Sequence, residues 1–245
     1  NAPAHTTWSL VGLLVAAGIV GAFHVGKAPP SLPSIRDGLG ATLSQAGWIL
    51  SILNLTTALS GMVIALTADR IGHRRLVLAG TAVCSTASLL GAFAGSIETL
   101  LLTRIVEGLG FIAVLVAAPT LLMRLAAAHD QRRAMTLWSS YMPAGNGLMM
   151  LIAAIVLPEA SWRVVWLVAA GASALMLVAL LLRALPQPEL GPQAPASRPV
   201  LHEMAEVASS GGPLALAVCF GAYACCWFTV VGFLPTLQIE RLGMA

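Results

Sequence analysis

The chain has 245 residues, of which 58% are hydrophobic and only 9% are charged. A soluble domain carries about 25% charged residues, so this composition excludes an ordinary soluble protein and indicates an integral membrane protein. The formal net charge of +3 is too small to indicate a nucleic-acid partner, and the basic residues gather between apolar segments, where they report membrane topology.

Seven apolar segments of about 20 residues predict transmembrane helices. They cover, in chain order, about 8–33, 45–67, 76–95, 99–125, 134–157, 164–182 and 211–237. Pro29, Pro30 and Pro33 are expected to strain or break the first helix before a polar stretch over 34–44. The sequence therefore predicts an all-α membrane protein: a six-helix bundle over 1–184, a proline-rich cytoplasmic linker over 185–209, and a seventh helix within 210–245.

Positively charged residues predict how the bundle is oriented. The turns after the second and fourth spans and the segment after the sixth are rich in arginine, whereas the opposite turns hold only Arg36 and Arg163, with Lys27 nearby. Short cytoplasmic loops carry the excess of Lys and Arg in membrane proteins. We therefore expect a multi-pass protein of the bacterial inner membrane with a cytoplasmic N-terminus.

A charged knot over residues 65–75 separates the second and third spans. It contains Asp69, Arg70, Gly72, Arg74 and Arg75. A carboxylate at a helix end needs a compensating cation, and the arginines can supply it. Gly72 permits a positive φ, which allows a tight reversal between two helices. The simpler alternative is that the knot only anchors the topology.

The knot resembles the signature loop between the second and third helices of the major facilitator superfamily, although Ala65 stands where that family usually has Gly. Arg104 with Gly108 and Gly110 is similar to a motif of the family's fourth helix, and 161–163 to its turn between helices five and six. The resemblance covers the whole chain. It implies inverted three-helix repeats, a conformational latch at the knot, and a chain that corresponds to the first half, the linker and the start of the second half.

Arg104 and Glu107 lie three residues apart in the fourth span and therefore on one helix face. An ionised side chain within the bilayer is costly, so it usually faces a cavity or a partner and has a function. The resemblance implies substrate binding or proton coupling for Arg104. The alternatives are an Arg104 side chain that reaches water at the membrane edge and a Glu107 that is only its structural partner.

Lys27 and His24 also lie three residues apart, in the first span, where they are candidates for a positively charged site that binds an anion. His24 can change charge in the physiological pH range. The alternative places both residues at the outer interface. Asn54, Tyr141 and Asn146 are further candidates to line a substrate cavity.

No cofactor, metal or enzymatic activity is expected. The four cysteines show no metal-ligand spacing, and a phosphate-loop spacing over 21–28 fails at Ala28, which replaces the required Ser or Thr. No Ser-His-Asp pattern is visible.

The leading hypothesis is a secondary transporter that moves a small anionic solute by alternating access, with protons or by exchange. In overall arrangement the chain looks most like cyanate-type, nitrate-type or organic-anion permeases. The alternatives are a drug or metabolite efflux pump of the same superfamily and, in a different class, a seven-span receptor or assembly subunit. The substrate, the direction of transport, the coupling ion and the oligomeric state stay open.

Overall fold

The computed structural model describes residues 5–183 and 209–242, apart from a few side chains within these ranges. The chain divides into two compact units, Asn1–Gln187 and Pro188–Ala245, and each is described by itself. The predicted linker over 185–209 lies outside the described residues except for its last residue, so its place in the chain stays a prediction.

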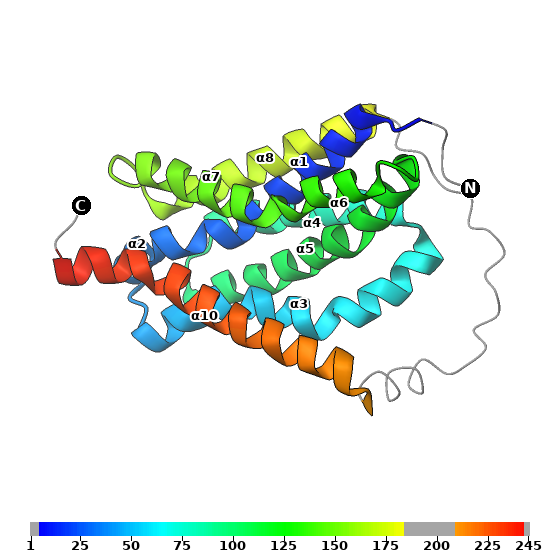
Figure 1. Cartoon of the computed structure of the whole chain (residues 1–245). Helices are drawn as coiled ribbons and strands as arrows, with labels where there is room; N and C mark the ends of the chain where they lie inside the picture. The colour runs from blue at the N-terminus through cyan, green and yellow to red at the C-terminus, as the bar shows by residue number, and fades with distance from the viewer. Residues whose placement is uncertain (1–4, 184–208, 243–245) are drawn as a thin grey trace. The chain divides into compact units, whose positions relative to one another are not determined.

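The first unit is a bundle of eight helices over its described residues (Figure 1). They are α1 (Trp8–Gly26), α2 (Ala28–Leu39), α3 (Leu43–Ile71), α4 (His73–Ala92), α5 (Ile97–Leu125), α6 (Gln131–Ser139), α7 (Tyr141–Val156) and α8 (Trp162–Leu182). Two pairs, α1 with α2 and α6 with α7, each form one long apolar segment, so the described residues contain six helices that can cross a membrane. This confirms the all-α membrane fold and the six predicted spans.

The boundary predicted for the first span was wrong. The prolines break the helix at Lys27, as expected, but do not end the span, because Pro29 and Pro30 occupy the first turn of α2, where a missing N–H removes no bond that the new helix needs. Pro33 is accommodated inside α2. The first span therefore extends to Leu39 and has 32 residues.

Glycine and arginine residues fix the turns at the two ends of the bundle. Gly72, at φ 95°, ends α3 and begins α4, which confirms the predicted need for a positive φ in the charged knot. At the opposite end, Arg163 Nη1 donates hydrogen bonds of 2.8 Å to the carbonyl oxygens of Ala92 and Ala94, just after α4. The turn that begins α8 is thereby tied to the end of α4.

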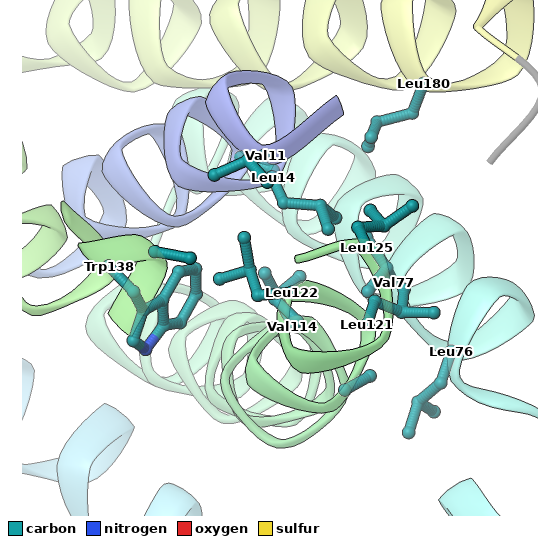
Figure 2. Close-up of a cluster of buried hydrophobic side chains, with 14 of the residues drawn as sticks. Val11, Leu14, Leu76, Val77, Val114, Leu121, Leu122, Leu125, Trp138 and Leu180 are labelled. Carbon is teal, nitrogen blue, oxygen red and sulfur yellow. The ribbon is translucent and has the colours of Figure 1, made fainter. Parts of the chain in front are cut away.

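Helix α5 lies at the centre of the bundle and packs against α1, α3 and α4. Figure 2 shows one apolar core, in which side chains of α1, α4, α5, α6 and α8 point toward one another. Its members include Val11 and Leu14 of α1, the 113–125 part of α5 and Leu180 of α8. This core occupies the end of the bundle at which α1 begins.

A second apolar core occupies the opposite end of the bundle. It contains Phe23 and Leu32 of the first span, Leu100 of α5, and Trp162 and Trp166 of α8. The same three elements carry buried polar side chains: His24 and Lys27 in the first span, Arg104 and Glu107 in α5, and Ser173 in α8. These side chains form the candidate site.

The second unit contains α10 (Gly211–Leu242), whose first part includes the apolar helical segment Leu214–Trp227. A helix was predicted here as the seventh span. The helix is present, and its role as a membrane span stays a prediction.

Candidate functional site

Four titratable side chains lie in the interior of the bundle between the two apolar cores. The exposed fractions of His24, Lys27 and Glu107 are 0%, and that of Arg104 is 1%. His24 lies close to the middle of the 32-residue first span. This burial argues against the alternatives that place Lys27 and His24 at the outer interface and Arg104 in water at the membrane edge.

Glu107 joins the two cations. Lys27 Nζ donates a hydrogen bond of 2.5 Å to Glu107 Oε1, and Arg104 Nη1 donates one of 2.5 Å to Oε2, so each carboxylate oxygen binds one cation. Charge-assisted hydrogen bonds of this kind are the strong ones in protein interiors. Two cations and one carboxylate leave one positive charge in excess while His24 is neutral. A positive charge without a counter-ion is costly in the membrane interior.

Backbone carbonyl groups hold Arg104 independently of Glu107. Its Nη1 donates to the carbonyl oxygen of His24 at 2.6 Å, and its Nε donates to that of Ile49 at 3.4 Å. These contacts link α5 to α1 and α3. The guanidinium group therefore keeps two neutral partners if the Glu107 carboxylate leaves it.

Neutral groups of α4 and α8 hold Lys27 in the same way. Lys27 Nζ donates to Ser88 Oγ at 2.6 Å and lies 4.5 Å from the centroid of the Trp166 ring, where a cation–π interaction is favourable. Ser88 Oγ in turn donates to the Trp166 carbonyl oxygen at 2.9 Å. The ammonium group is thus positioned by two residues that carry no charge.

A helix break brings Lys27 into this position. Lys27 lies between α1 and α2, where it adopts helical φ and ψ and its N–H still bonds to the Phe23 carbonyl oxygen. Pro29 and Pro30 provide no N–H to the carbonyl groups one turn earlier, so the hydrogen-bond ladder is interrupted beside Lys27. Discontinuous helices near the midplane are a recurring way to build binding sites in transporters.

His24 lies between α5 and α8. Its Nε2 is 2.8 Å from Ser173 Oγ, and its Nδ1 is 3.5 Å from Glu107 Oε1. In the part of the chain that the structure describes, Nδ1 has no hydrogen-bond partner although it is buried. A proton on Glu107 would have this nitrogen as its nearest basic neighbour.

The three other predicted cavity residues lie at different places. Asn146 of α7 is 5% exposed and packs against Gly26, next to Lys27, and its Oδ1 has no hydrogen-bond partner among the described residues. Asn54 Nδ2 donates to the Leu50 carbonyl oxygen of its own helix at 3.3 Å. Tyr141 stacks on Trp138, with ring centroids 4.6 Å apart, and belongs to the first core. Only Asn146 is brought next to the charged cluster.

The residues of the predicted latch lie at the turn between α3 and α4. Arg70 and Arg75 are exposed, and Gly72 and Arg74 are half-buried. The side chain of Asp69 lies outside the described part of the chain, so its partner is not identified. The latch stays a proposal.

Sequence reasoning missed Ser88, Trp166 and Ser173. Each contacts Lys27 or His24 from an apolar helix. An isolated serine or tryptophan in such a helix gives no signal of its own, because the same residues serve as ordinary packing groups. Only the position of these helices relative to Lys27 and His24 identifies them.

The family profile described as Major Facilitator Superfamily matches residues 10–245. The multidrug efflux pump LfrA of Mycolicibacterium smegmatis is 32% identical over 141 residues, which are 57% of this chain and 28% of that protein. The 3-(3-hydroxy-phenyl)propionate transporter of Escherichia coli is 24% identical over 231 residues, 94% of this chain and 57% of that protein. The chain thus spans less than two thirds of these relatives.

A solved structure shares the fold. The inward-facing, unoccupied bacterial homolog of the human lysosomal transporter Spinster matches with a TM-score of 0.75 and 18% identity, over 97% of this chain and 56% of that one. Proteins of the matched family are transporters, which argues against the receptor or assembly-subunit alternative. The length of the family match and the six membrane-length helices establish that the chain belongs to the Major Facilitator Superfamily.

Proposed function

We propose that this chain is part of a proton-coupled transporter that moves a small anionic solute across the bacterial inner membrane by alternating access. The observation that carries the proposal is the convergence of Lys27 and Arg104 on the single carboxylate of Glu107. A carboxylate held by two buried cations supports an anionic substrate. A substrate carboxylate has the same geometry and charge.

Glu107 acts as an internal anion that occupies the substrate's place. When Glu107 binds a proton, its carboxyl group loses its charge and releases both cations. Lys27 stays held by Ser88 and Trp166, and Arg104 stays held by backbone carbonyl groups, so the cation pair remains in position. A substrate anion then replaces the Glu107 carboxylate. One proton and one monovalent anion leave the net charge of the site unchanged, which couples the two species.

Two further features support the proposal. One relative that aligns over 94% of this chain is a transporter of 3-(3-hydroxy-phenyl)propionate, whose carboxyl group is ionised near pH 7. The excess positive charge of the cluster also attracts anions and repels cations. Alternating access would place this site near the bilayer midplane, with the Asp69 latch breaking and reforming at the cytoplasmic end.

Drug efflux is the second candidate function. The match to the multidrug efflux pump LfrA favours it, at 32% identity over 57% of this chain. A pump for cationic drugs would need a carboxylate free to face its substrate, whereas Glu107 is bound by two cations of the protein itself. The cluster therefore favours the anionic solute.

A thermal-shift screen of the full-length protein in detergent separates the two candidates. The ligands are carboxylates such as 3-phenylpropionate, their neutral amides, and cationic drugs, each tested on the wild type, Arg104→Gln and the exposed control Arg183→Gln. A ligand that binds the folded state raises its melting temperature by mass action. We expect carboxylates to stabilise the wild type and the control but not Arg104→Gln. Stabilisation by cations or amides alone would overturn the anion proposal.

A further inference from the structure

We propose that His24 receives the coupling proton from Glu107 and that Ser173, a residue of α8, is the positioning residue that makes His24 able to do so. This inference rests on the proposed function, because it assumes that Glu107 is protonated when the substrate binds. It adds the step that ends the state in which Glu107 is protonated and the substrate anion is bound. It also gives a role to the buried nitrogen of His24 that has no hydrogen-bond partner among the described residues.

The hydrogen bond to Ser173 fixes the orientation of the His24 ring and is compatible with either tautomer, because a hydroxyl group both donates and accepts. Only one nitrogen of a neutral imidazole carries a hydrogen. If Nε2 carries the hydrogen and donates it to Ser173 Oγ at 2.8 Å, then Nδ1 presents a lone pair toward Glu107 Oε1 at 3.5 Å. A lone pair facing an ionised carboxylate makes no hydrogen bond, whereas one facing a protonated carboxyl group accepts its proton.

The proton transfer changes two bonds. The O–H bond of the Glu107 carboxyl group breaks, a bond from the proton to His24 Nδ1 forms, and the electron pair stays on Glu107 as a carboxylate. The imidazolium that results directs Nδ1–H toward Glu107 and Nε2–H toward Ser173. Water that reaches the opened site later accepts the Nδ1 proton and leaves as hydronium.

The transfer has a direct consequence for the substrate. Once ionised again, Glu107 competes for Lys27 and Arg104 and displaces the substrate anion. The charged or titratable groups near His24 are Glu107 and Arg104 of α5, Lys27 at the α1–α2 junction, and Cys84 of α4 beside the Glu107 backbone. Two of these are cations, and their repulsion drives the imidazolium to lose its proton to water. His24 therefore links proton release to substrate release.

The test compares two activities of the full-length protein in liposomes: carboxylate uptake driven by a proton gradient, and equilibrium exchange of the same carboxylate. Exchange needs the cation pair but no net proton movement. His24→Gln keeps polar contacts but cannot titrate, so we expect its proton-driven uptake to fall by about 100-fold or more, a larger loss than that of exchange. Wild-type uptake in His24→Gln would overturn the relay.

Ser173→Ala tests the positioning role. We expect uptake to fall by about tenfold or more, because a His24 ring that is no longer held at Nε2 can turn its Nδ1 away from Glu107. Exchange should be retained, and Ser173→Thr should restore uptake because it keeps the hydroxyl group. Ser85→Ala is the matched control, since Ser85 Oγ also bonds across the α4–α8 interface, to the Ala170 carbonyl oxygen at 2.9 Å. Equal losses of uptake and exchange in Ser173→Ala would show a merely structural serine and contradict the proposal.

The wild type distinguishes failure of the relay from failure of the proposed function. If the wild type exchanges the carboxylate, and His24→Gln still takes it up in response to a proton gradient, then the proposal of an anion site is retained and the proposed proton transfer to His24 is wrong. If the wild type neither exchanges nor takes up any carboxylate, the proposed function itself is wrong.

Discussion

At the scale of single residues, we expect substitution of Glu107 to destabilise the protein strongly. Glu107 is the only counter-charge that the described residues give to Lys27 and Arg104. Glu107→Gln keeps the volume of the side chain and removes its charge. Breaking a buried ion pair from one side costs roughly 3–5 kcal/mol, because it leaves charges uncompensated. We therefore expect a lower melting temperature in detergent and a larger stabilisation by 3-phenylpropionate than in the wild type.

The control for this variant is Glu98→Gln. Glu98 is an exposed carboxylate in the first turn of the same helix, so its loss should change neither the melting temperature nor the stabilisation by 3-phenylpropionate. If Glu107→Gln melts like the wild type and gains nothing from the carboxylate, then Glu107 does not occupy an anion site.

The residues of the cluster could be predicted from the sequence, but their partners could not. Charges are rare in apolar segments, which is why Lys27, Arg104 and Glu107 were identified as candidates. The sequence separation between Lys27 and Glu107 is 80 residues, and their contact depends on how far α1 and α5 slide past each other. Nothing in either helix alone specifies that register. Ser88 and Ser173 were missed for the same reason.

At the scale of elements, the close approach of α1 and α7 depends on a glycine without a side chain. A Cβ atom on Gly145 would lie 2.4 Å from the Ile19 carbonyl oxygen and 2.5 Å from Ala22 Cβ. We expect Gly145→Ala to destabilise the protein by about 1–3 kcal/mol, as overpacking does in other cores. Gly147→Ala, in the same helix, meets no atom within 4 Å and should be neutral. Thermal unfolding of both variants checks this, and equal melting temperatures would contradict the close packing.

Arg163 makes a second prediction at this scale. Its side chain is the donor to the Ala92 and Ala94 carbonyl oxygens, so Arg163→Ala leaves two carbonyl groups without this partner. We expect a loss of roughly 1–3 kcal/mol, because an unsatisfied buried polar group costs about that much. Arg183→Ala, at the exposed end of α8, is the control. Unchanged thermal unfolding of Arg163→Ala would remove its role in joining α4 and α8.

Most elements could be predicted from apolar length alone, and the errors have physical reasons. The second and fourth to sixth spans begin within about three residues of their predicted starts, because long apolar runs specify membrane helices strongly. The first span was misjudged because proline stops a helix only when its missing N–H matters, and in α2 it does not for Pro29 and Pro30.

At the scale of the whole molecule, alternating access requires a contact that breaks at one end of the bundle while the site opens. The charged knot between α3 and α4 is the proposed contact, with Gly72 at φ 95° fixing its turn. We expect Asp69→Asn to insert into the membrane normally but to transport more slowly, because the carboxylate proposed to bind the arginines is gone. Uptake rates normalised to the amount of inserted protein check this. Rates equal to those of the wild type would remove the latch.

The most direct measurement of the central claim is the simultaneous flux of protons and a carboxylate through the full-length protein in liposomes. If an incoming anion replaces the carboxylate of Glu107, each monovalent anion must enter with one proton. Glu107→Gln should then exchange the anion without moving protons. Carboxylate uptake with no proton flux in the wild type, or unchanged coupling in Glu107→Gln, would contradict the account.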